Sequence, residues 1–141
     1  IVLCRIPSDA ETITQKHDGP HKGMAINVYV NDIGKSAMTQ IKNPHYPIGT
    51  VIIKEKFPFE FNDTVHPKEV ELYTIMIKRA KGYNPECGDW EFAAINGDLG
   101  ESKQGKLESC IKCHKTKDEM DYVFSDDYLA EKYRNKINHV H

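Results

Sequence analysis

The sequence predicts an α+β fold, in which helices flank a mainly antiparallel β-sheet and one helix lies near the C-terminus. Three observations support this prediction. Residues 24–30 alternate between large apolar side chains and small or polar ones, as a half-buried strand does. Residues 50–57 and 72–77 are rich in β-branched and apolar side chains, which favour strands. Residues that cap helices follow the first strand and recur near the C-terminal end.

Four strands are expected, at residues 24–30, 50–57, 69–80 and 89–95. The alternation in the first strand places Met24, Ile26, Val28 and Val30 on one face. The third strand is apolar throughout its centre, so we expect it to be buried on both faces, and Gly82 ends it. These strands make a sheet of four or five strands.

Three helices are expected. Asn31 and Asp32 can cap a short helix through about residue 42, which Pro44 ends. A polar segment at residues 96–105 leads into a second short helix. A third helix is capped near Ser125 and extends to about residue 136.

The length and composition predict one domain at residues 24–141, preceded by an extended, polar N-terminal arm at residues 1–23. Of the 141 residues, 39% are hydrophobic, and no run of 18 apolar residues could span a membrane. The net charge of -2, without a cluster of Lys or Arg, argues against nucleic acid as a partner.

The second short helix contains the most specific motif, Cys-Ile-Lys-Cys-His at residues 110–114. Two thiols three residues apart can bond to the two vinyl groups of one haem, and the histidine that follows can bind its iron. Half of a zinc site is the alternative, but Cys4 and Cys87 lack the paired spacing of a second ligand pair. The motif therefore predicts one haem c, attached through Cys110 and Cys113, with His114 as the proximal iron ligand.

Haem attachment to this motif normally takes place on the exported side of a membrane. We therefore expect a periplasmic protein from which a leader has been removed, since no basic and apolar leader opens the sequence. In that compartment Cys4 and Cys87 could form a disulfide that closes a loop of over eighty residues, or remain two separate thiols. Both alternatives stay open.

His114 lies near the C-terminal end of the sequence, unlike the motif histidine of ordinary small electron-transfer cytochromes. Met120 follows it too closely to reach the opposite face of the same haem. A sixth iron ligand would have to come from upstream, where five side chains are candidates: Met24, Met38, Met76, His45 and His66.

Five segments in order resemble the cytochrome P-460 family, which includes the cytochromes c-prime-beta. They are Gly-Thr-Val-Ile-Ile-Lys-Glu at 49–55, Met-Ile-Lys-Arg at 76–79, Gly-Asp-Trp-Glu-Phe at 88–92, the haem motif, and Asp-Tyr-Val-Phe at 121–124. The resemblance extends from about Met24 to about Tyr128. It implies a mainly antiparallel fold, a homodimer, and a five-coordinate haem. It also implies oxidation of hydroxylamine, with nitric oxide as a companion ligand, and a lysine bonded to the haem ring, here Lys54.

Without the family resemblance, strand alternation places Lys54 on the same face as Ile52. We expect Lys54 at a strand end, within reach of a buried group. Desolvation there would favour the neutral amine, which is the nucleophilic form. The alternative is a lysine that extends to water or pairs with Glu55 or a haem propionate.

The expected distal pocket differs from that of the hydroxylamine-oxidising members, which carry an arginine three residues before a tyrosine. Counting back from Tyr29, that position is Ile26. Phe57, Phe59 and Phe61 could cap an apolar distal face, as phenylalanines do in the c-prime-beta branch, or pack in the core. Glu60 is a candidate general base or a solvated loop residue. A polar group of residues 121–124 is expected to hold the ring N–H of His114.

Three functions remain open. The first is an enzyme with a Lys54 cross-link that oxidises hydroxylamine or nitric oxide and passes electrons to a partner cytochrome. The second is a protein with an apolar pocket that binds nitric oxide or another gas without turnover. The third is a simple electron carrier whose sixth ligand comes from an upstream His or Met.

Overall fold

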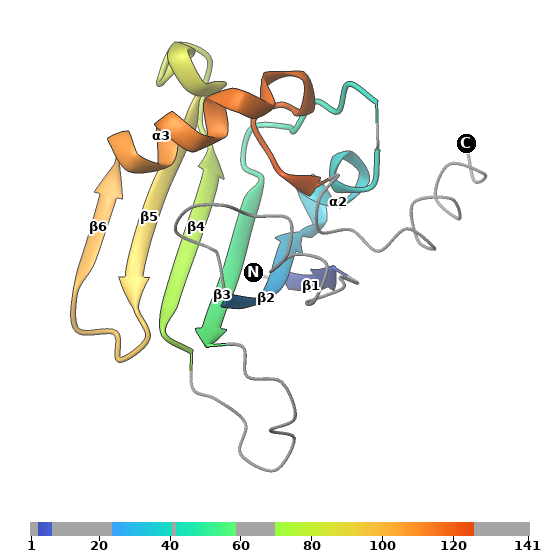
Figure 1. Cartoon of the computed structure of the whole chain (residues 1–141). Helices are drawn as coiled ribbons and strands as arrows, with labels where there is room; N and C mark the ends of the chain where they lie inside the picture. The colour runs from blue at the N-terminus through green and yellow to red at the C-terminus, as the bar shows by residue number, and fades with distance from the viewer. Residues whose placement is uncertain (1–2, 7–23, 41, 59–69, 126–141) are drawn as a thin grey trace.

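The computed structural model describes residues 3–6, 24–40, 42–58 and 70–125, and gives the backbone alone at residues 3–6, 24–25 and 57–58. These residues form a six-stranded antiparallel sheet in which every strand pairs with its neighbours in sequence order (Figure 1). Short helices lie at its margins. The predicted α+β class with a mainly antiparallel sheet is confirmed.

The strands are β1 (Leu3–Ile6), β2 (Met24–Asn31), β3 (Val51–Pro58), β4 (Leu72–Lys78), β5 (Trp90–Asn96) and β6 (Ser102–Gly105). The helices are α2 (Asp32–Met38), α3 (Glu108–His114) and two 3₁₀ helices, η1 (Pro85–Cys87) and η2 (Lys115–Met120). Among the described residues, none of these helices is long and apolar enough to cross a membrane.

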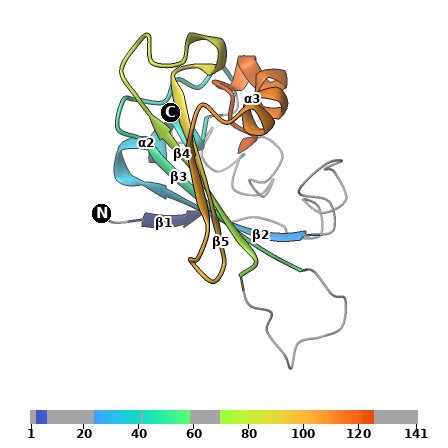
Figure 2. The same ribbon diagram turned by 90° about the vertical axis from the view of Figure 1, so that its left-hand side faces the viewer.

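Directly paired residues of antiparallel strands place their side chains on the same face, so the register defines an inner face of the sheet. Three rows of side chains cross it. The first row is Val30–Ile52–Met76–Phe92, the second is Val28–Lys54–Thr74–Ala94, and the third is Ile26–Lys56–Leu72. Helix α3 lies beside this inner face when the sheet is seen nearly edge-on (Figure 2). These three rows therefore form the sheet wall of the space between helix α3 and the inner face.

The hydrophobic core lies between the inner face and the helices. Val28, Val30 and Ile52 from the strands pack with Ile111 of α3 and Val123 beyond η2, and all five are at most 3% exposed. On the opposite, outer face of the sheet most side chains are half-buried, although Glu91 and Ala93 of β5 are buried. This corrects the expectation that the third predicted strand is buried on both faces, because in β4 only Met76 is buried.

Two strands were not anticipated. Residues 3–6 of the expected irregular arm pair with β2 at one edge of the sheet. Residues 102–105, expected to be a polar connection, pair with β5 at the other edge. Both are edge strands of four residues. Residues 102–105 are mostly exposed, and backbone pairing makes them a strand, so the apolar periodicity of the sequence did not reveal it.

The first predicted helix is confirmed at its start and is shorter than expected. Asn31 caps α2 through a hydrogen bond that its side chain accepts from the backbone N–H of Gly34. The helix ends at Met38, whose fully buried side chain packs in the core. The helix predicted at residues 125–136 lies outside the described residues, except for Ser125.

Candidate functional site

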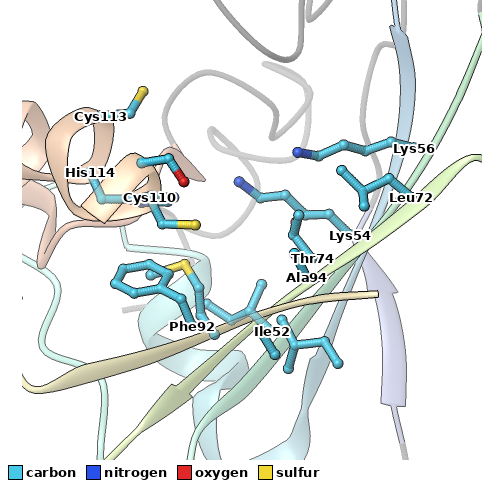
Figure 3. Close-up of a pocket in the computed structure, with 14 residues that line it drawn as sticks. Ile52, Lys54, Lys56, Leu72, Thr74, Phe92, Ala94, Cys110, Cys113 and His114 are labelled. Carbon is cyan, nitrogen blue, oxygen red and sulfur yellow. The ribbon is translucent and has the colours of Figure 1, made fainter. Parts of the chain in front are cut away.

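Helix α3 carries both cysteines and the histidine of the motif. Cys110 and Cys113 are half-buried, His114 is 7% exposed, and all three line one cavity between α3 and the inner face of the sheet (Figure 3). Ile111, which does not line the cavity, anchors the helix in the core at 3% exposure. The spacing of the motif on one helical turn therefore presents two thiols and an imidazole to the same space.

The imidazole of His114 is oriented by the segment that follows it. Its Nδ1 lies 2.6 Å from the carbonyl oxygen of Tyr122. A carbonyl oxygen only accepts hydrogen bonds, so Nδ1 is the donor and Nε2 carries the lone pair that can bind a metal. This confirms the expectation that a polar group of residues 121–124 holds the His114 ring N–H. The rings of Phe92 and Phe124 pack against the imidazole, with centroids 5.2 and 5.0 Å from that of His114.

A second network holds the Tyr122 segment against the sheet, and it is centred on Asp121. The Asp121 carboxylate accepts hydrogen bonds from the Lys78 ammonium at 2.9 and 3.0 Å and from the backbone N–H of Tyr46 at 2.8 Å. Its backbone carbonyl accepts the indole N–H of Trp90, which is fully buried. Three of the five motif segments, those with Lys78, Trp90 and Asp121, thus meet behind the histidine and fix its orientation.

The cavity between α3 and the sheet has a volume of about 150 Å³ and is partly open to solvent. Its lining is mainly apolar, with Ile52, Met76 and Phe92 at the end near His114. Two thiols and an imidazole at one edge of an apolar cavity are the donor set of a covalently attached haem, so the residues present fit that group.

Lys54 lines the same cavity and is 6% exposed. Its Nζ lies 5.7 Å from the centroid of the Phe124 ring, which in turn packs on His114. The residue lies in the middle of β3 rather than at a strand end, which corrects that detail of the prediction. Glu55, the expected ion-pair partner, accepts a hydrogen bond from the Tyr29 hydroxyl on the outer face. The lysine amine is therefore directed inward, toward the cavity, and not to solvent.

Lys56 is a site residue that sequence reasoning missed. It is 2% exposed, lies on the same face of β3 as Lys54, and extends toward α3 in the same cavity (Figure 3). Burial, and after it the charge of Lys54, lower the pKa of the Lys56 ammonium from 10.5 to about 7, and the two cysteine thiols partly offset this shift. The signal was present in the sequence, because strand alternation places residues 52, 54 and 56 on one face.

The candidate distal residues are only partly described. Ile26 is buried at 3% and pairs with Lys56 in the third row, so it adds an apolar side chain beside the second lysine. The backbone of Phe57 pairs with Ala25, but its side chain is outside the described part of the structure. Phe59, Glu60 and Phe61 also lie outside it.

Among the candidate sixth ligands whose side chains the structure describes, Met76 lines the cavity and Met38 and His45 do not. Met38 is fully buried, and its sulfur accepts the hydroxyl of Tyr46 at 3.7 Å. His45 is exposed. Met76 lines the cavity but belongs to the first row, beside the Phe92 that packs on His114. His66 and the side chain of Met24 lie outside the described residues.

The disulfide alternative for Cys4 and Cys87 is not formed, because Cys87 is a buried free thiol. Cys4 belongs to the edge strand β1, while Cys87 lies just before β5. Neighbouring strands are about 4.8 Å apart, and β2, β3 and β4 separate these two elements in the sheet. The Cα atoms of a disulfide are at most about 7 Å apart. The two cysteines therefore belong to different parts of the sheet.

Comparison with known proteins gives one match. A family model described as Cytochrome P460 matches residues 8–125, which is most of the chain. No curated protein matches the sequence. The matched range includes every residue that lines the cavity.

Proposed function

The chain belongs to the cytochrome P460 family, and from this we propose that it is a mono-haem c-type cytochrome that oxidises hydroxylamine or nitric oxide. Membership of the family implies a haem cofactor. In the proposed protein one haem c is attached through Cys110 and Cys113, His114 is its proximal ligand, and Lys54 is bonded to its ring. The observation that carries the proposal is the presence of a buried lysine amine in the same cavity as two thiols and an oriented imidazole.

Each of these residues is suited to its role. Burial raises the pKa of the Cys110 thiol, which keeps this thiol protonated until it reacts. The Tyr122 carbonyl holds the proton on Nδ1 of His114, which leaves Nε2 as the ligand atom and makes the imidazole more basic. When bound, the haem would supply a redox-active iron. The apolar rings of Phe92 and Phe124 exclude water from the proximal side.

Lys54 supports the enzymatic reading. Its amine is inside the cavity, 5.7 Å from the Phe124 ring centroid, and away from Glu55. A solvated lysine on the outer face would be a poor candidate for a covalent bond to a buried group. An amine that the strand directs into the cavity is already at high effective concentration near its target.

The test is the ferrous optical spectrum of wild type and the variant Lys54→Met, with Lys103→Met as the matched control. Lys103 is an exposed lysine on β6 that does not line the cavity, so its loss removes the same chemical group outside the site. Wild type and Lys103→Met should show a strongly red-shifted Soret band, and Lys54→Met should show that of an ordinary haem c. Proteolysis and mass measurement should recover haem on the Cys110 peptide in all three proteins, and on the Lys54 peptide only where the band is shifted.

A specific observation favours a second function, the binding of nitric oxide or another gas without turnover. The position of the distal arginine of hydroxylamine-oxidising members is Ile26 here, and this side chain is buried. An apolar distal wall favours small neutral ligands over hydroxylamine. Tight nitric oxide binding without hydroxylamine turnover in a protein with an unshifted Soret band would establish this function instead of the first. Sharp low-spin bands in the ferrous protein would instead indicate a simple electron carrier.

The remaining parts of the proposal concern the location, the electron partner and the oligomeric state of the protein. Covalent haem attachment by the 110–114 motif supports a periplasmic location, with a partner cytochrome as the electron acceptor. The family resemblance supports a homodimer. Sedimentation of the holoprotein and rapid mixing with an oxidised c-type cytochrome test the dimer and the electron transfer separately.

A further inference from the structure

A lysine and a tryptophan lie on the inner face of the sheet next to the row that contacts His114. Lys78 of β4 pairs directly with Trp90 of β5, two residues beyond the pair of Met76 and Phe92, so all four side chains lie on the same face. The Lys78 ammonium lies 5.0 Å from the centroid of the Trp90 ring, which is a cation–π distance. Phe92 packs on His114. The pair of Lys78 and Trp90 therefore borders the site, and the proposed function gives neither residue a role.

Asp121 connects this pair to the segment that follows α3. The Lys78 ammonium donates to both carboxylate oxygens of Asp121, at 2.9 and 3.0 Å. The indole N–H of Trp90 donates to the backbone carbonyl of Asp121 at 2.9 Å. The next residue is Tyr122, whose carbonyl oxygen accepts the N–H of His114. Two neighbouring strands thus hold the residue immediately before the carbonyl that orients the imidazole.

The backbone at this point has a conformation that needs such support. Asp121 and Tyr122 are both left-handed, with φ values of 51° and 66°, and this conformation is unfavourable for residues that carry a Cβ. It persists only where surrounding contacts impose it. Lys78 and Trp90 supply these contacts at Asp121, and the N–H of Tyr122 donates to the carbonyl of Lys117 at 2.8 Å. The result of this turn is a Tyr122 carbonyl that faces the imidazole.

The hydrogen bond on Nδ1 controls how strongly the other ring nitrogen donates to a metal. The distance of 2.6 Å from Nδ1 of His114 to the Tyr122 oxygen is shorter than the usual range of about 2.7 to 3.2 Å for an N–H···O hydrogen bond. A carbonyl that turned away from the ring would leave the imidazole less basic. A less basic ligand stabilises ferric iron less, so the reduction potential would rise.

We propose that Asp121, held by Lys78 and Trp90, is a positioning residue that sets how strongly His114 donates to the haem iron. It thereby keeps the reduction potential of the iron low. The inference rests on the haem-containing part of the proposed function, since the iron reports the effect. It is independent of the Lys54 cross-link and of the substrate, and none of Lys78, Trp90 and Asp121 lines the cavity.

Three variants weaken the hold on Asp121 in different ways. Asp121→Asn keeps the size of the side chain and suits the left-handed backbone, but it removes the charge that binds Lys78. Lys78→Met removes the cation and leaves Asp121 in place. Trp90→Phe removes the indole N–H and keeps an aromatic ring. The matched control is Glu91→Gln on the outer face, because Glu91 also forms an ion pair, with Arg79, and its side chain is 11% exposed, as is that of Asp121.

The experiment measures the iron–histidine stretching frequency of the ferrous holoprotein by resonance Raman spectroscopy, and the reduction potential. Wild type and Glu91→Gln should agree in both. Asp121→Asn, Lys78→Met and Trp90→Phe should each lower the stretching frequency and favour reduction by about threefold to tenfold. The double variant of Asp121→Asn with Lys78→Met should show no larger change than either single variant, because both remove the same ion pair. If the wild-type iron is six-coordinate, the reduction potential alone makes the comparison.

Wild-type values in both Asp121→Asn and Lys78→Met would overturn the proposal, and a loss of stability in urea would then show that Asp121 has a structural role only. Equal changes in Glu91→Gln would overturn it too. If Asp121→Asn does not take up haem, Lys78→Met decides the question. Failure of the proposed function looks different: an unshifted Soret band or absent hydroxylamine turnover in the wild type refutes the enzyme and leaves the comparison among these variants unchanged.

Discussion

The imidazole Nδ1 of His114 donates a hydrogen bond to the carbonyl oxygen of Tyr122 over 2.6 Å, eight residues further along the chain. Both Asp121 and Tyr122 have left-handed backbone conformations, with φ values of 51° and 66°. This unusual pair of residues turns the carbonyl of Tyr122 back toward the ring. The cavity on one side of His114 and the Asp121 network on the other are therefore linked by a single backbone group.

The first prediction concerns the packing under Tyr122. A Cβ at Gly88 would lie 2.5 Å from Cδ2 of Tyr122, at a φ of +63°. Gly88→Ala should destabilise the protein by about 2 to 4 kcal/mol through the clash and the left-handed backbone. Gly82→Ala is the control, since Gly82 also has positive φ, at +98°, but its Cβ would meet nothing within 4 Å. Urea unfolding should place Gly82→Ala between wild type and Gly88→Ala; equal losses would mean that the Tyr122 contact is unimportant.

The second prediction compares a partly buried ion pair with an exposed one. Lys78 and Asp121 are 13% and 11% exposed, and Asp121→Ala leaves a buried ammonium and the Tyr46 N–H without the carboxylate. We expect a loss of about 2 to 3 kcal/mol in the free energy of unfolding. Glu86→Gln, which breaks the solvent-exposed Lys115–Glu86 pair, should leave the unfolding midpoint within error. A loss of similar size in the free energy of unfolding of both variants would contradict the expectation that the partly buried pair contributes more than the exposed pair.

The third prediction follows from the pKa of Lys56. This pKa is lowered from 10.5 to about 7 in the folded protein, so between these values the unfolded chain binds more protons and folding stability rises with pH. Wild type should gain roughly 2 kcal/mol relative to Lys56→Met between pH 7 and pH 9, and nothing below pH 6. Urea unfolding of both proteins across this range measures the difference. Parallel stability curves would show that Lys56 does not titrate there.

The fourth prediction concerns Cys87. Burial raises the pKa of its thiol to about 12, so only about one molecule in 10⁴ carries the reactive thiolate at pH 8. Alkylation of the native holoprotein by iodoacetamide should label Cys87 far more slowly than alkylation in denaturant. Denatured holoprotein should show two reactive thiols, those of Cys4 and Cys87. Finding neither without a reductant would show that the two form a disulfide after all.

Much of the fold could be read from the sequence because its central strands bury one apolar face. Alternation in residues 24–30 and the β-branched run near Ile52 predicted β2 and β3, and Asn31 predicted the start of α2. The edge strands β1 and β6 escaped prediction. Hydrogen bonding to a neighbouring strand makes them strands, and a one-dimensional pattern does not show which strand that neighbour is.

The candidate site also has features that the sequence predicts and features that depend on the tertiary structure. The 110–114 motif determined by itself which residues could hold a haem, since covalent attachment depends on the spacing of two thiols and an imidazole along one helical turn. The sequence also identified Lys54, through the segment at residues 49–55. Only the tertiary structure decided that Lys54 and Lys56 both face the cavity, that the Tyr122 carbonyl orients His114, and that Cys87 is far from β1 across the sheet. These are contacts between separate elements, and they depend on strand register and helix packing, which local sequence does not specify.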